Sequence, residues 1–246
     1  MTQNSPNSPP SQWSLCRFLR TMAYFGAVPI LSQFDWFQRR FGNPAHPHVD
    51  SPALTTTSPS SSSTTEPTVF DFTTQPDPQF EAIWGALDDV VMGGVSASSF
   101  RKVGASAVFA GTVSTANSGG FASVRTRNFD PPLDWSGFDG VKLRVRGDGQ
   151  RYKFMLHQDT NWDSVAYCHS FDTVDREWIT VQIPFTAFTP VFRARTLPDA
   201  PALNLSRICA LQLMLSKFEY DSALNPTFQP GAFQLQIERI QLYSNS

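Results

Sequence analysis

The feature that most constrains this chain is its hydrophobic period, which becomes two residues from Thr68 onward. Side chains alternate between the two faces of a β-strand, so this period predicts strands with one buried face. Nine or ten such segments follow one another with Gly, Pro, Asp and Asn between them, and no convincing long helix interrupts them. We therefore predict one all-β domain, an antiparallel sandwich or jelly roll, over residues 68–244. The clearest alternating sets are Val141, Leu143 and Val145; Ile179, Val181 and Ile183; Leu211, Leu213 and Leu215; and Phe233, Leu235 and Ile237.

The residues before this domain divide by composition. Residues 1–10 are polar and rich in Pro, which predicts disorder, and residues 44–67 are rich in Pro, Ser and Thr. Such a stretch buries too little surface to offset its ordering entropy, so we interpret 44–67 as a linker. Between the two, residues 11–43 carry apolar side chains at helical spacing and predict a pair of short amphipathic helices.

The helical pair needs a surface for its apolar face, because neither helix has a core of its own. Aromatic residues combined with arginines are typical of interfacial helices. We predict that the pair anchors the protein to a membrane surface or to a membrane-embedded partner. The alternative is that the apolar face packs back onto the sandwich as a structural cap. The residues predicted for the anchor are Trp13, Arg17, Phe18, Arg20, Phe25, Phe34, Arg39 and Arg40.

Charge and cysteine content narrow the class of protein. The formal net charge is −2 at pH 7, so the chain lacks the concentrated basic footprint that binds nucleic acid. The three cysteines form no CxxC pair, which argues against a disulfide framework and favours a reducing compartment. No apolar run is long enough to span a membrane. We therefore expect a cytoplasmic protein, or one that lies peripherally on the reducing face of an energy-transducing membrane.

The most unusual stretch of the chain is WGALDDVVMGGVS at residues 84–96. Adjacent carboxylates point to opposite sides of an extended chain, so they are poor partners for general acid–base catalysis. We predict that the two acids make turns by accepting local backbone N–H groups, and that the glycine pair supplies positive φ or a close backbone approach. The alternative is a ligand or calcium contact. The candidate binding residues here are Trp84, Asp88, Asp89, Met92, Gly93, Gly94 and Ser96.

Two further clusters are candidate binding loops. The segment 117–125 predicts a turn that leads into a strand, with its Phe inward or at the rim. The Asp-Gly pair at 148–149 lies between two strand-like runs and predicts a hairpin turn. Basic residues on the neighbouring strands are predicted to share a solvated outer face, with an anionic partner as the alternative. The loop candidates are Gly119, Gly120, Phe121, Arg125, Gly147, Asp148 and Gly149, and the basic set is Arg125, Arg127, Lys142, Arg144, Arg146 and Lys153.

Recognisable catalytic and metal-binding motifs are missing from the sequence. No GxSxG, HExxH or GxGxxG element occurs, and the histidines have no neighbouring pattern of acid and nucleophile. We therefore predict a binding protein and not an enzyme, with no cofactor and no metal.

A set of motifs resembles, in this order along the chain, the complex I intermediate-associated protein 30 domain: WGALDDVVMGGVS, GGFASVR, GFDGVKLRVRGDGQRYKF, WITVQIPF, PVFRAR and GAFQLQIERIQLY. The resemblance covers residues 70–243 and implies a galactose-binding-like jelly roll. It implies a role in assembling respiratory complex I or a photosynthetic electron-transport complex, with subunits of that complex or its assembly intermediates as partners. It implies neither catalytic residues nor a dinucleotide cofactor, and it adds Arg193 of PVFRAR to the candidate binding residues.

Two other functions stay open at this stage. Galactose-binding-like jelly rolls bind sugars at loops on one end, so a carbohydrate- or small-ligand-binding module is the main alternative. Trp84, Trp135 and Trp162 are able to stack on sugar rings, or else to pack in the core or at its rim. The third hypothesis is an enzyme whose catalytic motifs are not recognised.

Overall fold

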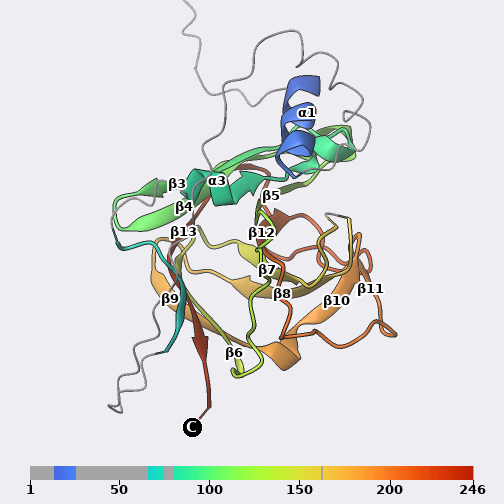
Figure 1. Cartoon of the computed structure of the whole chain (residues 1–246). Helices are drawn as coiled ribbons and strands as arrows, with labels where there is room; N and C mark the ends of the chain where they lie inside the picture. The colour runs from blue at the N-terminus through green and yellow to red at the C-terminus, as the bar shows by residue number, and fades with distance from the viewer. Residues whose placement is uncertain (1–13, 26–65, 75–79, 162, 246) are drawn as a thin grey trace, which may run out of the picture.

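A computed structural model describes residues 14–25, 66–74, 80–161 and 163–245, and its main body is a sandwich of two antiparallel sheets (Figure 1). The all-β jelly-roll prediction is therefore confirmed. The first sheet contains β1 (Thr68–Asp71), β3 (Ala97–Val103), β4 (Ser106–Val113), β6 (Gly140–Arg146), β9 (Trp178–Pro184) and β13 (Gly231–Tyr243). Its strand order is β3-β4-β13-β6-β9, and β1 also pairs with β13.

The second sheet has the strand order β11-β10-β8-β7-β12-β5-β2. These strands are β2 (Trp84–Ala86), β5 (Phe121–Thr126), β7 (Arg151–His157), β8 (Ala166–Asp172), β10 (Thr189–Phe192), β11 (Arg195–Thr196) and β12 (Ala210–Ser216). The short helical elements are α1 (Leu15–Tyr24), α3 (Phe80–Ile83) and the 3-10 turns η2 (Asp89–Met92), η3 (Ala116–Ser118) and η4 (Phe185–Ala187).

The sequence alternation becomes a buried interior between the sheets. On β6, Val141, Leu143 and Val145 are buried, and the basic residues between them are half-buried. On β13, burial follows the odd positions to Ile237 and then continues at Ile240 and Leu242. The register shifts between Ile237 and Arg239, as in a β-bulge, and this extra residue changes which positions face inward.

Aromatic rings join the two layers. Phe109 of β4 packs against Phe233 of β13 with ring centroids 4.9 Å apart, and against Tyr152 of the opposite sheet at 6.3 Å. Within the described residues, the main hydrophobic cluster has all its members at or after Val69, and none belongs to α1. The sandwich therefore has a core that does not depend on the helix.

Helix α1 lies outside the two layers, next to η2 and β2 (Figure 1). It begins after the N-cap Ser14, whose hydroxyl accepts a hydrogen bond from the Arg17 N–H at 3.4 Å. This helix belongs to the first half of the predicted pair. The second predicted helix and the predicted disordered segment at 1–10 lie outside the described residues, as does the predicted linker up to residue 65.

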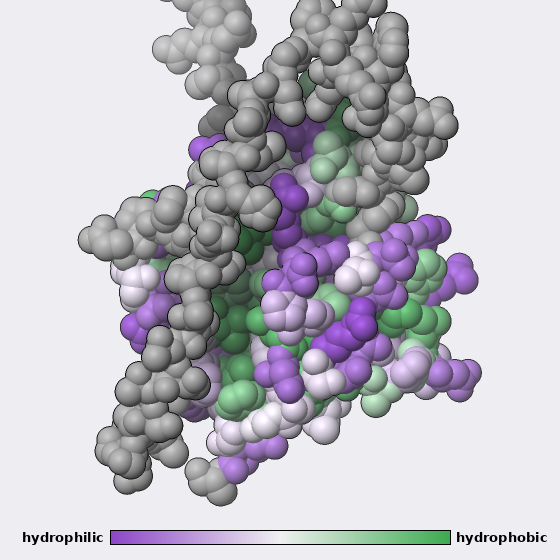
Figure 2. Space-filling view, in the orientation of Figure 1, coloured by the Kyte–Doolittle hydropathy of each residue, from purple (hydrophilic) through white to green (hydrophobic). Residues whose placement is uncertain are grey.

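Two sequence predictions about strand neighbours are wrong. The Asp-Gly turn does not close a hairpin, because β6 and β7 lie in different sheets. A tight turn is nevertheless present there, with φ of +83° at Gly149. The six basic residues do not share an outer face either, since β5 and β7 belong to the sheet opposite β6, and Arg125 and Lys153 are buried. Figure 2 shows hydrophilic and hydrophobic residues interspersed over one face of the molecule.

Candidate functional site

A glycine pair ends the 3-10 turn η2. Gly93 has a φ of +92°, the left-handed conformation in which glycine is favoured, so the predicted positive φ is present at this position. Gly94 has no positive φ. It provides instead the predicted close approach to the backbone, here by the Asp89 side chain. A Cβ at Gly94 would lie 2.3 Å from Cγ of Asp89, which leaves no room for any side chain.

The carboxylate of Asp89 is buried and ties three segments together. Its Oδ1 accepts from the Ser96 N–H at 2.9 Å, and its Oδ2 accepts from the Ser96 hydroxyl at 2.6 Å. Oδ2 also accepts from the N–H groups of Gly120 at 2.8 Å and Phe121 at 3.4 Å. A Cβ at Gly119 would lie 2.4 Å from the same oxygen, so the glycines on both sides make space for this side chain.

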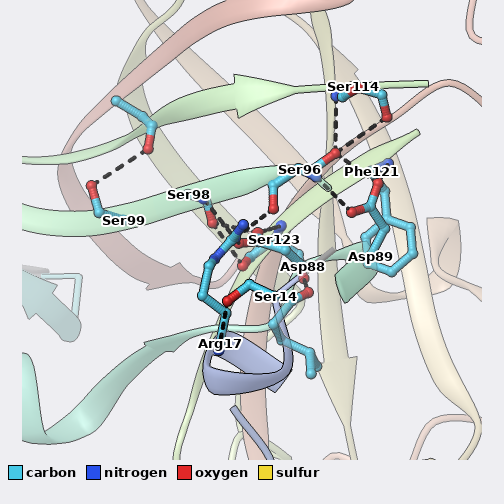
Figure 3. Close-up of polar contacts among 12 residues, drawn as sticks. Ser14, Arg17, Asp88, Asp89, Ser96, Ser98, Ser99, Ser114, Phe121 and Ser123 are labelled. Carbon is cyan, nitrogen blue, oxygen red and sulfur yellow. Dashed lines mark hydrogen bonds and ion pairs between the residues drawn. The ribbon is translucent and has the colours of Figure 1, made fainter. Parts of the chain in front are cut away.

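Asp88 is equally buried but points to a different set of donors (Figure 3). It accepts from the Ser98 hydroxyl at 2.6 Å, the Ser98 N–H at 2.9 Å and the Ser123 N–H at 3.0 Å. Its fourth donor is the guanidinium of Arg17 on α1, at 3.2 Å. We call Asp88 and Asp89, together with Ser96, Ser98, Gly120 and Ser123, the carboxylate hub.

The hub differs from the local turns that the sequence predicts. Asp88 is the N-cap residue of η2, yet its side chain makes no capping hydrogen bond there. Both acids accept from donors that lie between 7 and 35 residues away within the sandwich. The calcium alternative finds no support in this geometry, because N–H and O–H groups aimed at a carboxylate oxygen occupy the positions that a cation would need.

Burial raises the pKa of Asp88 from 3.8 to about 6, while its hydrogen bonds and Arg17 act in the opposite direction. The folded pKa therefore lies above the unfolded one. Protonation of Asp88 therefore favours the folded state. Its contribution to the free energy of unfolding is fully present below about pH 4 and is lost as the pH rises through 6, by at most roughly 1.4 kcal/mol per pH unit. We predict that Asp88→Asn removes this part of the pH dependence, measured as the free energy of unfolding in urea from pH 4 to 7. An unchanged slope in the variant would assign the dependence to other groups.

Helix α1 joins the hub through its first turn. The guanidinium of Arg17 reaches both the Asp88 carboxylate and the backbone carbonyl of Ser96 (Figure 3). Arg17 is 31% exposed whereas Asp88 is 2% exposed, so the ion pair crosses from solvent into the domain. Such a half-exposed pair contributes specificity of placement more than stability.

The last turn of α1 makes a second contact. The Tyr24 hydroxyl donates to the Ala82 carbonyl at 3.0 Å, and the Arg127 guanidinium lies over the Tyr24 ring, 4.2 Å from its centroid. Gly85 lies beneath this ring, since a Cβ there would be 2.3 Å from a ring carbon. Arg125 lies over the Phe25 ring at 5.9 Å. We call Ala82, Gly85, Asp88, Ser96 and Arg127 the α1-binding surface.

The predicted anchor residues have different surroundings. Arg17 pairs with Asp88, Phe18 and Phe25 are half-buried, and Arg20 is exposed. Helix α1 thus contacts the sandwich, as in the alternative of a structural cap, but Phe18 and Phe25 are only half-buried there, and the membrane or partner anchor stays a prediction. Leu15 and Leu19 on the outer side of α1 are 56% and 43% exposed. The other predicted anchor residues, Trp13, Phe34, Arg39 and Arg40, lie outside the described residues.

The predicted binding loops do not form one site. The 84–96 and 119–125 segments meet at the carboxylate hub. The Gly147–Gly149 turn has other neighbours, because Asp148 accepts from the Tyr152 hydroxyl at 3.0 Å and from the Gln234 N–H at 2.9 Å. Arg193 is exposed and forms an ion pair with Asp163.

The individual aromatic candidates also differ in exposure. Trp84 is buried against Phe100, with ring centroids 4.7 Å apart, and Trp135 is buried against Phe185. Met92 is 76% exposed, and Phe121 is half-buried. Trp162 lies outside the described residues.

A polar network on the outer face of the second sheet has no counterpart in the sequence predictions. His157 donates through Nε2 to Gln212 at 2.9 Å, and Gln212 donates to the Ser123 hydroxyl at 3.0 Å. Burial lowers the pKa of His157 to about 3, so the ring is neutral at physiological pH. The same network reaches the hub through Ser123.

Sequence reasoning missed several residues of the site, above all Ser98, Ser123, Gly85 and Tyr24. A signal for Ser98 was present, because Ser96 and Ser98 occupy alternate positions at the start of a strand and so share a face. No sequence signal connects Tyr24 with Gly85, which are brought together only by the docking of α1.

The described part of the chain contains no group of three or more His, Cys, Asp or Glu side chains placed to hold a metal ion. No helix among those residues has the length and apolar character needed to cross a membrane. All three cysteines, Cys16, Cys168 and Cys209, are free, and Cys16 is exposed.

Known proteins resemble this chain in sequence. The family model described as Complex I intermediate-associated protein 30 matches residues 70–237. An uncharacterized protein of Schizosaccharomyces pombe is 31% identical over 175 residues, which cover 61% of this chain and 79% of that protein. The Drosophila melanogaster protein named complex I intermediate-associated protein 30, mitochondrial, is 25% identical over 133 residues, which cover 50% of this chain and 42% of the fly protein. The chain thus spans less than half of that named relative.

A solved structure shares the fold. The family 11 carbohydrate-binding module of the cellulosomal cellulase Lic26A-Cel5E of Clostridium thermocellum superposes with a TM-score of 0.53 at 20% identity, over 75% of this chain and 97% of the module. At this identity the likeness concerns the jelly-roll architecture alone.

Proposed function

Because this chain belongs to the complex I intermediate-associated protein 30 family, we propose that it is a non-enzymatic assembly factor of a membrane electron-transport complex. Its partners are protein subunits of a complex I-like or photosynthetic complex, or their assembly intermediates. The observation that carries this proposal is the extent of the family match, whose 168-residue span of 70–237 includes the whole carboxylate hub of the sandwich.

The chemistry of the hub supports binding over catalysis. Asp88 and Asp89 accept hydrogen bonds from backbone and serine donors, and so both are used to hold loops in place. His157 is neutral and enclosed, which leaves it out of reach of a substrate. Loops that are held to neighbouring strands by buried hydrogen bonds suit recognition of another protein.

For the location of the protein, we propose contact with membrane-embedded subunits from the reducing side of the membrane. The free cysteines are compatible with a reducing compartment. The names of the fly and nematode relatives place those proteins in mitochondria.

The carbohydrate-binding alternative receives no specific support from the site. Two of the three tryptophans proposed for sugar stacking, Trp84 and Trp135, are buried in the core and present no ring face to a ligand. The architecture shared with a carbohydrate-binding module is common to domains of many functions.

The assembly role predicts a defect in a strain that lacks this protein. On native gels of its membranes, we expect the mature electron-transport complex to decrease and a smaller assembly intermediate to accumulate. The tagged wild-type chain is expected to restore the complex and to co-purify with the intermediate. The variant Gly137→Ala serves as a control for complementation. Its added Cβ meets no atom within 4 Å, so it should restore assembly as well as the wild-type chain does. Normal amounts of every electron-transport complex in the deletion strain would contradict the assembly role.

A further inference from the structure

The contact between α1 and the sandwich has the features of a ligand in a binding site. The helix contributes no residue to the main hydrophobic cluster, and its polar contacts are concentrated at its two ends. Residues 26–65 separate it from the described part of the sandwich, which begins at 66. Thr21 and Met22 of the helix are buried, but the helix lies outside the main core and is therefore a peripheral element docked on a complete domain.

The α1-binding surface is shaped for its occupant. Gly85 leaves a flat area on β2, and the Tyr24 ring fills it so closely that a Cβ would lie 2.3, 2.6 and 2.7 Å from three ring atoms. The Ala82 carbonyl accepts from both the Tyr24 hydroxyl and the Arg127 guanidinium, so the cation that covers the ring is itself held in place. Burial raises the pKa of Tyr24, which keeps its hydroxyl protonated as a donor.

The other end of the surface recognises a cation. Asp88 has a buried carboxylate that already accepts from Ser98 and Ser123, and Arg17 supplies its remaining donor. Arg17 and Tyr24 are seven residues apart, which is two helical turns, so both project from the same side of the helix. Charge at one end and a ring-sized flat area at the other define the spacing and the direction of any helix that binds here.

We propose that the α1-binding surface is an exchangeable helix-binding site, that α1 occupies it as a built-in ligand, and that its external ligand is a partner helix with a cation seven residues before a tyrosine. Exchange is favoured because α1 is held from outside the main core. Its contacts include the Arg17 ion pair with Asp88, the Arg17 hydrogen bond to the Ser96 carbonyl and the Tyr24 hydrogen bond to Ala82. They also include the cation–π contacts on the Tyr24 and Phe25 rings, and Thr21 and Met22 are buried between these two ends. The covalent tether raises the local concentration of α1, and so the site is filled in the free protein.

This inference does not depend on the proposed assembly role, because the chain's own helix serves as the probe. A peptide of residues 14–25 is labelled at Cys16, which is exposed on the docked helix, and is titrated by fluorescence anisotropy into a fragment of residues 66–246. The fragment contains the whole main core, and its fold is verified by circular dichroism. We expect saturable binding to the fragment. We expect binding at least about tenfold weaker to the full chain, where α1 competes in cis.

Substitutions on both sides of the contact make the test specific. Gly85→Ala in the fragment places a methyl group in the volume of the Tyr24 ring, and we expect it to weaken binding by about tenfold or more. Gly137→Ala is the same change where the added Cβ meets nothing within 4 Å, and binding should stay unchanged. Arg17→Ala and Tyr24→Ala peptides should each bind more weakly. The proposal is overturned by any of three results: no saturable binding up to about 1 mM peptide, equal affinity for the Gly85→Ala fragment, or equal affinity for the fragment and the full chain.

Discussion

Replacing Asp89 with alanine is expected to lower the free energy of unfolding of the sandwich by about 3 to 5 kcal/mol. Two buried N–H donors, those of Ser96 and Gly120, would lose their acceptor, and the Ser96 hydroxyl would keep only the Ser114 carbonyl at 3.3 Å. A buried donor without a partner costs about 1 to 3 kcal/mol, and bonds to a charged acceptor lie at the upper end of this range. Urea unfolding monitored by tryptophan fluorescence at pH 7 measures the effect.

An exposed aspartate provides the matched control. Asp134 accepts from the N–H and hydroxyl of Ser136 at 2.9 and 2.6 Å, a pair of bonds like those between Asp89 and Ser96, but it lies on the surface. Asp134→Ala should therefore change stability very little, since water replaces the lost acceptor. The stability of Asp89→Asn should lie between that of wild type and that of Asp89→Ala. The asparagine amide keeps one acceptor oxygen, but its NH2 group faces the donors that the other carboxylate oxygen of Asp89 accepted from. If Asp89→Ala were as mild as Asp134→Ala, the hub would have no structural importance.

Gly94→Val is the second substitution for which we expect a large loss, about 3 kcal/mol or more. The added Cβ would lie 2.3 Å from Cγ and 2.4 Å from Oδ1 of Asp89, so the carboxylate has to move away from its donors. Gly93→Val is expected to lose less stability, about 1 to 3 kcal/mol, and for a different reason. A φ of +92° is strained for valine, but no atom lies within 4 Å of the new Cβ. Thermal and urea unfolding of both variants compare the two causes.

Two further variants separate collision from backbone strain. Gly93→Asn should recover part of the stability lost in Gly93→Val, because asparagine tolerates positive φ better than a β-branched residue does. The double variant Asp89→Ala with Gly94→Ala should lose less than the sum of the single losses, because the first change removes the carboxylate that the new methyl group would meet. Additive losses would show that Gly94 acts independently of Asp89.

The alternating pattern was sufficient to predict the strands, because alternation is a local property of an extended chain. Val141, Leu143 and Val145 face inward as the sequence indicates, and so do Leu211, Leu213 and Leu215. The same local rule predicted a hairpin between β6 and β7, and that prediction is wrong. A tight turn specifies a change of direction, but it does not specify whether the next strand stays in the same sheet.

Functional residues were harder to assign than strands. Both acids of the 84–96 segment were recognised as unusual, yet their local sequence suggested turn formation. Their actual donors come from β3, from β5, from the residue just before each of these strands and from α1, and in the case of Arg17 from a residue 71 positions away. Arg125 and Lys153 were expected on a solvated face, but both are buried on the outer side of the second sheet, where Lys153 donates to the carbonyls of Phe218 and Glu219.

The amino-acid sequence by itself therefore determined the fold class, the family resemblance and the existence of an amphipathic N-terminal helix, since each of these follows from composition and short-range spacing. The tertiary structure decided which strands face one another, how Asp88 and Asp89 hold the loops, and where α1 binds. These last features depend on pairings between distant segments, and each pairing is selected by the fit of buried donors, carboxylates and ring faces once the sandwich has formed. A sequence specifies which side of a strand is apolar, whereas the space that Gly85 leaves for Tyr24 exists only after the helix and the sheet have come together.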